Sequence, residues 1–270
     1  MRFAICNEVF QGWKLEDAFA FAAKTGYDGV EIAPFTLARS VTGVPAAERR
    51  RIRDLANRWR LEVSGIHWVL AQTEGLHLTH PDRAVRDRTA CYLGQLIDFC
   101  ADLGGKFMVV GSPKQRDRLE GVSAEQAWEW ATAVFRQPVM RAEERAVTVC
   151  LEPLSPTETN FINTAAEAIQ FVQQLRTPHF KIILDVKAMS AENQPIPRII
   201  RQSWPHFAYF HANDKNLKGP GFGEVDFRPI AAALEAVGYP GWVSVEVFNF
   251  DAGPEAIAIR SLEYLRKVFG

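Results

Sequence analysis

Four side chains in the second half of the chain have the types that bind a divalent metal ion. They are Glu152, Asp185, His211 and Glu246, and each ends or directly follows a short apolar run rich in Val, Ile and Phe. Charged groups are almost never buried unless they are paired or bound to a metal. Three carboxylates and one imidazole suit a hard or borderline ion such as Mn²⁺, Mg²⁺, Co²⁺ or Zn²⁺. We therefore predict a site for one divalent metal ion and no nucleotide cofactor.

The chemistry that such a site favours is proton transfer beside a carbonyl. A divalent ion on the carbonyl oxygen stabilises the enediolate that forms when the adjacent carbon loses its proton. One carboxylate removes the proton and a second returns it. Glu152 and Glu246 are the candidates for this pair, because they follow different runs and could reach opposite faces of a substrate. Return to the same carbon gives epimerisation, and return to the neighbouring carbon gives isomerisation.

Other polar residues near the ends of apolar runs are secondary candidates. His67 could contact substrate, support a ligand, or simply pack against Trp68. Glu31 lies within its run and is expected to support the site rather than bind the metal. A basic stretch is expected to be a solvated loop, with phosphate binding as the alternative: Lys114, Arg116 and Arg118.

The elements that position these side chains alternate along the chain. Eight β-rich runs cover residues 2–6, 29–33, 61–68, 106–112, 147–153, 181–186, 207–212 and 242–248. Helical spacing covers residues 15–26, 87–104, 124–145, 164–175 and 255–269. Such alternation implies parallel strands with right-handed crossovers. At 270 residues, eight units predict an α/β chain of the (β/α)₈ TIM-barrel type, as a single domain over residues 1–270. The active site of such a barrel lies at the carboxyl ends of its strands.

Composition excludes several other classes. The formal net charge is −1, whereas nucleic-acid-binding proteins usually carry a basic balance or stripe. No apolar run approaches the roughly 20 residues of a membrane span. The four cysteines form no C-x-x-C pair, and the first residues do not resemble a signal peptide. We expect a cytoplasmic protein that binds neither nucleic acid nor membrane.

Four segments resemble the xylose-isomerase-like sugar isomerase/epimerase superfamily: CLEPLSPTETNFINT, IILDVKAMS, FHANDKNLKGPGFGEVDF and GWVSVEVF. Within it, the chain is similar to the D-tagatose 3-epimerase, hydroxypyruvate isomerase and inosose-processing groups. The resemblance implies a small carbohydrate substrate and a TIM barrel, and it implies that the four residues above are the metal ligands. It also implies that Glu152 and Glu246 act as the acid/base pair and that Glu158 orients the site. Relatives often form dimers or tetramers, which makes a homo-oligomer a candidate.

Two departures from the epimerase pattern concern substrate contacts. The epimerases carry a substrate-binding histidine three residues after the metal-binding aspartate, where this chain has Ala188. The adjacent Lys187 is expected to point to the opposite side, as in an extended segment. The arginine that follows the strand-seven histidine is also missing, and this loop instead offers Asn213, Lys215 and Lys218 as substrate contacts. We therefore expect a modified, acidic or cyclic keto-sugar rather than a plain ketohexose.

Three other functions stay open at this point. A keto-inositol (inosose) dehydratase would use the same metal site and would then expel hydroxide. A metal-dependent apurinic endonuclease would need a multi-metal cluster with extra histidines. A non-catalytic sugar-binding or regulatory barrel would bind metal without turnover.

Overall fold

Eight parallel strands form a closed barrel in the computed structural model, which describes residues 1–270. Each strand pairs with its neighbours in sequence order, and the first pairs with the last. The strands are β1 (Arg2–Cys6), β2 (Gly29–Ile32), β3 (Glu62–Ile66), β4 (Phe107–Val110), β5 (Thr148–Leu151), β6 (Phe180–Asp185), β7 (Phe207–Ala212) and β8 (Trp242–Val245). The predicted TIM barrel is confirmed.

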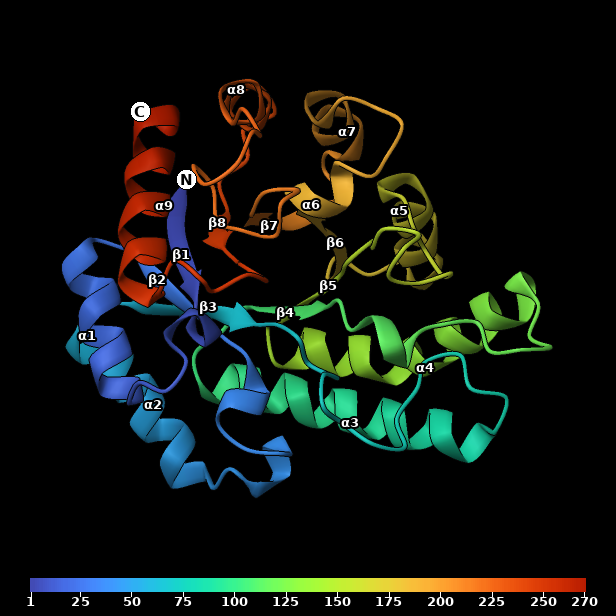
Figure 1. Cartoon of the computed structure of the whole chain (residues 1–270). Helices are drawn as coiled ribbons and strands as arrows, with labels where there is room; N and C mark the ends of the chain where they lie inside the picture. Colours follow the sequence, from blue (N-terminus) through green and yellow to red (C-terminus); the bar gives the residue numbers. More distant parts are fainter.

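Helices surround the barrel and cover its outer face (Figure 1). They are α1 (Leu15–Thr25), α2 (Ala46–Arg58), α3 (Arg83–Asp102), α4 (Ala124–Glu144), α5 (Ala165–Val172), α6 (Val186–Met189), α7 (Ile196–Ser203), α8 (Arg228–Ala236) and α9 (Pro254–Phe269). A large apolar cluster fills the space between strands and helices. None of the helices combines the length and apolar character that a membrane crossing needs.

Helix starts follow local capping chemistry. Ser123 and Gln126 form a reciprocal capping box at the start of α4, and Thr164 and Glu167 form one at α5. Each box satisfies two backbone N–H groups that would otherwise lack partners. These capping boxes therefore determine the residues at which α4 and α5 begin.

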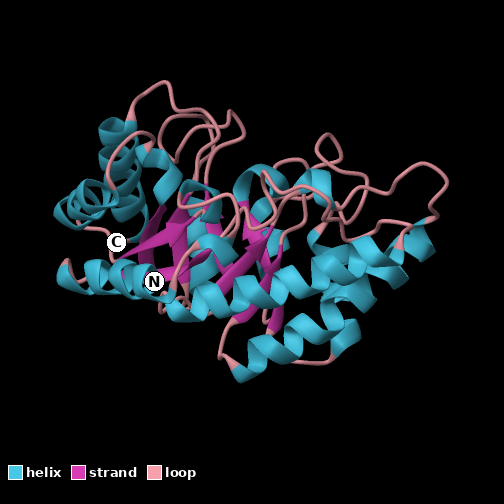
Figure 2. Cartoon of the chain, turned by 90° about the horizontal axis from the view of Figure 1, so that it is seen from below, coloured by secondary structure: helices cyan, strands magenta, loops and turns pink.

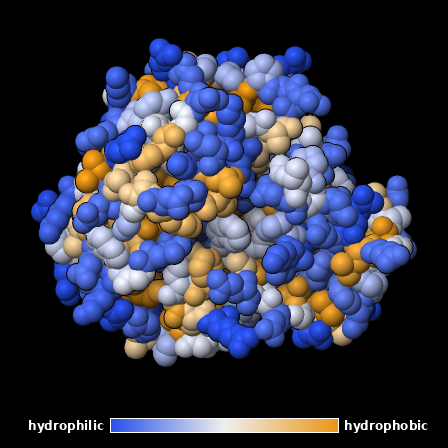
Figure 3. Space-filling view, in the orientation of Figure 1, coloured by the Kyte–Doolittle hydropathy of each residue, from blue (hydrophilic) through white to orange (hydrophobic).

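The interior of the barrel changes from apolar to polar along its axis. Trp242 and Tyr209 fill one level together with small apolar residues, and Trp242 fits because Gly29 opposite has no Cβ. Above this level the Tyr209 hydroxyl lies 2.7 Å from the Ser64 hydroxyl. The longest loops gather on one side of the molecule (Figure 2), and polar and apolar side chains are mixed over the face viewed in Figure 3. The four candidate metal ligands lie at the carboxyl ends of β5, β6, β7 and β8.

Candidate metal centre and active site

The four candidate ligands converge at one end of the barrel. Asp185 is the last residue of β6 and His211 lies in β7, while Glu152 and Glu246 directly follow β5 and β8. One ligand atom from each lies within 4.8 Å of all the others, and all four residues are buried. Metal–oxygen and metal–nitrogen bonds are about 2.0–2.2 Å long, so ligands of one ion lie within roughly twice that distance. The spacing therefore suits one ion.

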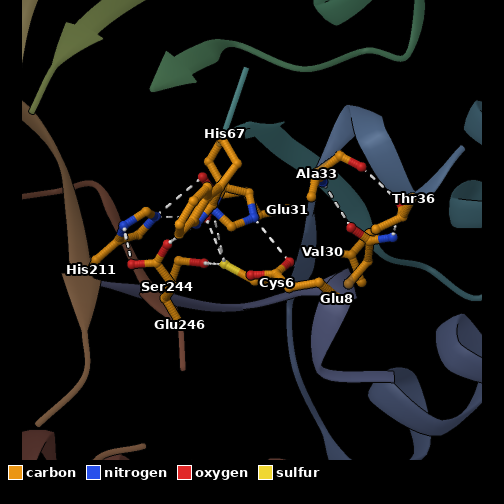
Figure 4. A network of polar contacts seen from close by, with 12 residues as sticks. Cys6, Glu8, Val30, Glu31, Ala33, Thr36, His67, His211, Ser244 and Glu246 are labelled. Carbon is orange, nitrogen blue, oxygen red and sulfur yellow. Dashed lines mark hydrogen bonds and ion pairs between the residues drawn. The ribbon is translucent and has the colours of Figure 1, made fainter. Parts of the chain in front are cut away.

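His211 provides the strongest sign that the cluster fits a cation. Its Nε2 lies 3.0 Å from Glu31 Oε2, on the inner side of the barrel (Figure 4). Its Nδ1 is buried, makes no hydrogen bond, and lies 3.0 Å from Glu246 Oε2. Metal-binding histidines usually keep one nitrogen on the metal and give the other to a carboxylate. Glu31 therefore lies where the sequence predicted a supporting carboxylate, and Nδ1 is left for a ligand.

The two glutamates of the cluster have contrasting surroundings. Glu246 Oε1 accepts a hydrogen bond of 2.8 Å from Trp68 Nε1 and lies 3.2 Å from His67 Nδ1. The Glu152 carboxylate makes no hydrogen bond within the protein, and burial together with the charges of Glu246 and Asp185 raises its pKa to about 8. Burial also opposes ionisation of Glu246, yet the positive charge of His211 and the contact with His67 lower its pKa well below the usual value. Two carboxyl groups with opposite pKa shifts are typical of acid/base sites.

The segment after Asp185 is helical, which corrects the expectation for Lys187. Asp185 Oδ1 accepts the backbone N–H of Ala188 at 2.7 Å and so caps α6. In this one-turn helix Lys187 turns toward the site, where its Nζ lies 2.6 Å from Glu158 Oε1 and 4.0 Å from the centre of the Phe248 ring. The extended geometry assumed from the sequence was wrong. Lys187 is a residue of the site that sequence reasoning missed.

A small cavity lies directly above the cluster. Its lining residues are His67, Trp68, Gly111, Pro113, Glu152, Leu154, Glu158, Lys187, Glu246 and Phe248. The predicted substrate contacts His67 and Glu158 are therefore brought to the site. Both are tied to other side chains, because His67 Nε2 lies 3.0 Å from Glu8 Oε2 and Glu158 pairs with Lys187.

The three predicted contacts after β7 are placed differently. Asn213 is fully buried, and its Nδ2 donates to Asp185 and Glu246, so it holds two candidate ligands rather than lining the cavity. Lys215 is exposed and pairs with Glu224 at 3.0 Å. Neither Lys215 nor Lys218 lines the cavity. Their roles in substrate binding stay predictions.

Two residues near the end of β4 position Glu152. A Cβ on Gly111 would lie 1.6 Å from Glu152 Oε2, so only glycine leaves room for this carboxylate. Arg116 is fully buried and donates to the backbone carbonyl oxygens of Glu152 and Val110, both at 2.6 Å. The prediction that Arg116 belongs to a solvated loop was wrong. Its partners are backbone atoms, which leave no pattern in the sequence.

Comparisons with known proteins agree with the fold. The chain is 26% identical over 246 residues to the L-ribulose 3-epimerase of Mesorhizobium japonicum, covering 91% of this chain and 79% of that protein. It is 23% identical to the 3-dehydro-D-guloside 4-epimerase of Escherichia coli, covering 91% and 92%. The structure of the D-psicose 3-epimerase from Clostridium cellulolyticum with D-tagatose superposes with a TM-score of 0.88 at 22% identity, covering 100% and 99%.

These similarities confirm the predicted enzyme class, isomerase or epimerase, since similar proteins are named as L-ribulose, D-psicose or ketose 3-epimerases. The model of one protein family also matches residues 19–268, which is nearly the whole barrel. The chain belongs to the xylose isomerase-like TIM barrel family.

Proposed function

We propose that the enzyme epimerises keto-sugars with one divalent metal ion bound by Glu152, Asp185, His211 and Glu246. The observation that carries the proposal is the buried set of three carboxylates around His211 Nδ1, which makes no hydrogen bond within the protein. Relatives named as 3-epimerases of L-ribulose and D-psicose support the reaction type. Isomerisation by the same proton transfer is the neighbouring outcome.

The bound ion would polarise the substrate carbonyl and stabilise the negative charge that develops beside it. Glu152 lines the cavity and makes no hydrogen bond through its side chain, so its carboxyl group is free to take up and release a proton of the substrate. Glu246 is held in place by Trp68 and stays ionised, which suits the opposite half of the transfer. Lys187 and Glu158 lie across the cavity, where they can hold substrate hydroxyls.

The metal part of the proposal predicts the behaviour of two ligand variants. His211→Ala and Asp185→Ala each leave an incomplete set of ligands, so we expect loss of most bound metal from an otherwise folded barrel. Elemental analysis after dialysis against Mn²⁺, with circular dichroism to check folding, measures this. Lys267→Ala in the last turn of α9 serves as a control. Full metal occupancy in both variants would remove these residues from the ligand set.

The chemical part predicts the behaviour of Glu152→Gln. The amide keeps the size of the side chain but cannot take up a proton, so turnover should fall by about 10²–10⁴-fold. Exchange of the proton next to the ketone with D₂O, followed by NMR on L-ribulose and D-psicose with Mn²⁺, measures this step. Wild-type exchange rates in a fully metal-loaded variant would show that Glu152 is not the base. Loss of water from the product would instead indicate a dehydratase.

A further inference from the structure

A second and larger cavity adjoins the one above the metal cluster. Its volume is about 620 Å³, and it shares Trp68, Pro113 and Phe248 with the first cavity. The rings of Trp68 and Phe248 lie 6.1 Å apart, centre to centre, at the boundary between the two. Ligand cavities are commonly about 300–1,000 Å³ in size. The two rings therefore form a wall that both cavities share, and the second cavity is the larger space next to the cluster.

Glu8 is a buried charged group that the proposed chemistry does not use. It lines the second cavity and is only 6% exposed. Its Oε2 lies 3.0 Å from His67 Nε2, whereas its Oε1 is buried and makes no hydrogen bond. A buried acceptor without a partner destabilises the folded protein, and the penalty is larger for a charged group. Glu8 Oε1 therefore lacks a hydrogen-bond partner, which a hydroxyl group of a bound ligand would supply.

The remaining walls combine flat apolar surfaces with amide groups. Phe35 and Phe250 line the second cavity, and so do the amide side chains of Gln72 and Gln115. Aromatic faces cover the C–H face of a sugar ring, while amides both donate to and accept from its hydroxyl groups. A purely apolar ligand would leave Glu8 Oε1 and these amides without partners. The lining therefore matches a hydroxylated ring.

We propose that the second cavity binds a second sugar ring, so that the substrate is a keto-sugar in glycosidic linkage to another hexose. The inference rests on the proposed function, because it places the reacting keto-sugar unit at the metal cluster. The linked ring lies in the second cavity beside Trp68 and Phe248 and gives one hydroxyl group to Glu8. This arrangement selects the substrate by its second ring rather than by the ketose alone.

Two disaccharides and one monosaccharide test the proposal. Isomaltulose and lactulose are fructose units that carry a second hexose and keep the ketone free. Exchange of the proton next to the ketone with D₂O gives kcat/KM for each and for fructose, with Mn²⁺ present. We expect at least one disaccharide to exceed fructose by tenfold or more. Saturation-transfer NMR reports separately whether the second ring contacts the protein.

Three variants act on the second cavity. Ala71→Trp fills it, Phe35→Ala removes one wall, and Glu8→Met removes the free acceptor. Each variant should lower the ratio of disaccharide to fructose kcat/KM toward one, because only the disaccharide uses the second cavity. A variant that merely disturbed His67 would lower kcat/KM for both substrates alike and leave the ratio unchanged. Ala133→Trp on the exposed face of α4 is the matched control and should leave the ratio unchanged.

The outcomes separate this inference from the proposed function. If fructose exchanges as fast as both disaccharides, the second-ring site is wrong while the epimerase proposal stands. If no ketose exchanges its proton with D₂O, the epimerase proposal is wrong. Saturation-transfer NMR then decides whether the second cavity still binds the second ring. Transfer to the second ring that disappears in Ala71→Trp would still support the site, and absence of transfer in the wild type would overturn it.

Discussion

At the scale of single residues, Lys187 changes the chemistry of the site most. Burial opposes its charge, but the carboxylates of Asp185 and Glu158 raise its pKa, so it stays an ammonium group. Its Nζ is positioned by Glu158 and by the face of Phe248. The sequence lacks the substrate-binding histidine of the epimerases at Ala188, and Lys187 offers a permanent donor from the neighbouring position.

Removal of this ammonium group should therefore impair substrate binding. Lys187→Met keeps the length of the side chain and its contact with Phe248 but cannot donate. Hydrogen bonds to charged groups contribute about 1.5–3 kcal/mol, so kcat/KM should fall by roughly 10–150-fold, mainly through KM. Steady-state kinetics with the best ketose substrate measures the change. Unchanged KM would mean that Lys187 only balances the charge of Glu158, and Lys267→Met controls for loss of a surface charge.

At the scale of elements, the ends of β4 and β5 form a matched pair. β4 ends before Gly111, whose missing Cβ makes room for the carboxylate that follows β5. Arg116 then ties the two strand ends together through Val110 and Glu152. The position of Glu152 therefore depends on the neighbouring strand as much as on its own.

Gly111→Ala should displace the Glu152 carboxylate while leaving the barrel intact. The added methyl group occupies the space of Glu152 Oε2, so we expect metal content and turnover to fall together. Elemental analysis and kinetics measure the two effects. Gly94→Ala in α3 is the matched control, since nothing lies within 4 Å of its added Cβ. There alanine should raise stability by about 0.5–1 kcal/mol. A fully active Gly111→Ala would contradict this packing argument.

At the scale of the whole molecule, the proposed metal site would link β5, β6, β7 and β8 to the stability of the barrel. A ligand that binds only the folded state stabilises it by about 2.7 kcal/mol at 100 times its Kd. For a chain of this size each kcal/mol shifts Tm by about 2 °C, so Mn²⁺ should raise the Tm of the metal-free protein by roughly 5 °C. Thermal unfolding with EDTA and then with excess Mn²⁺ tests this. His211→Ala should show no such rise, and a rise of equal size there would indicate binding elsewhere.

The barrel and the convergence of the four ligands could be predicted because both depend on repeated patterns. Each strand is a short apolar run, and the carboxyl ends of parallel strands must meet on one face. The capping boxes at Ser123 and Thr164 were confirmed for the same reason, since their chemistry is local. The hydrophobic pattern and the local capping chemistry were enough to predict the strands, the helices and their order along the chain.

The positions of other site residues depend on contacts that no pattern encodes. Lys187 was placed wrongly because α6 begins directly after β6, capped by Asp185 itself. Arg116 was assigned to solvent because its partners are backbone carbonyl oxygens, which any residue type carries. The second cavity is formed by side chains from several loops and has no signature in any one of them.

The contact between Glu31 and His211 also bears on how the imidazole would bind the proposed metal ion. A carboxylate at Nε2 favours the tautomer that carries its hydrogen there, which would leave the Nδ1 lone pair for the proposed metal ion. The orientation of the His211 ring is thus set by Glu31, a fully buried residue that does not line the cavity. A substitution such as Glu31→Gln would alter the electron density on Nδ1 without touching a ligand. Substitutions at Glu31, in the barrel interior, would therefore change the affinity for the proposed metal ion without changing the residues that contact substrate.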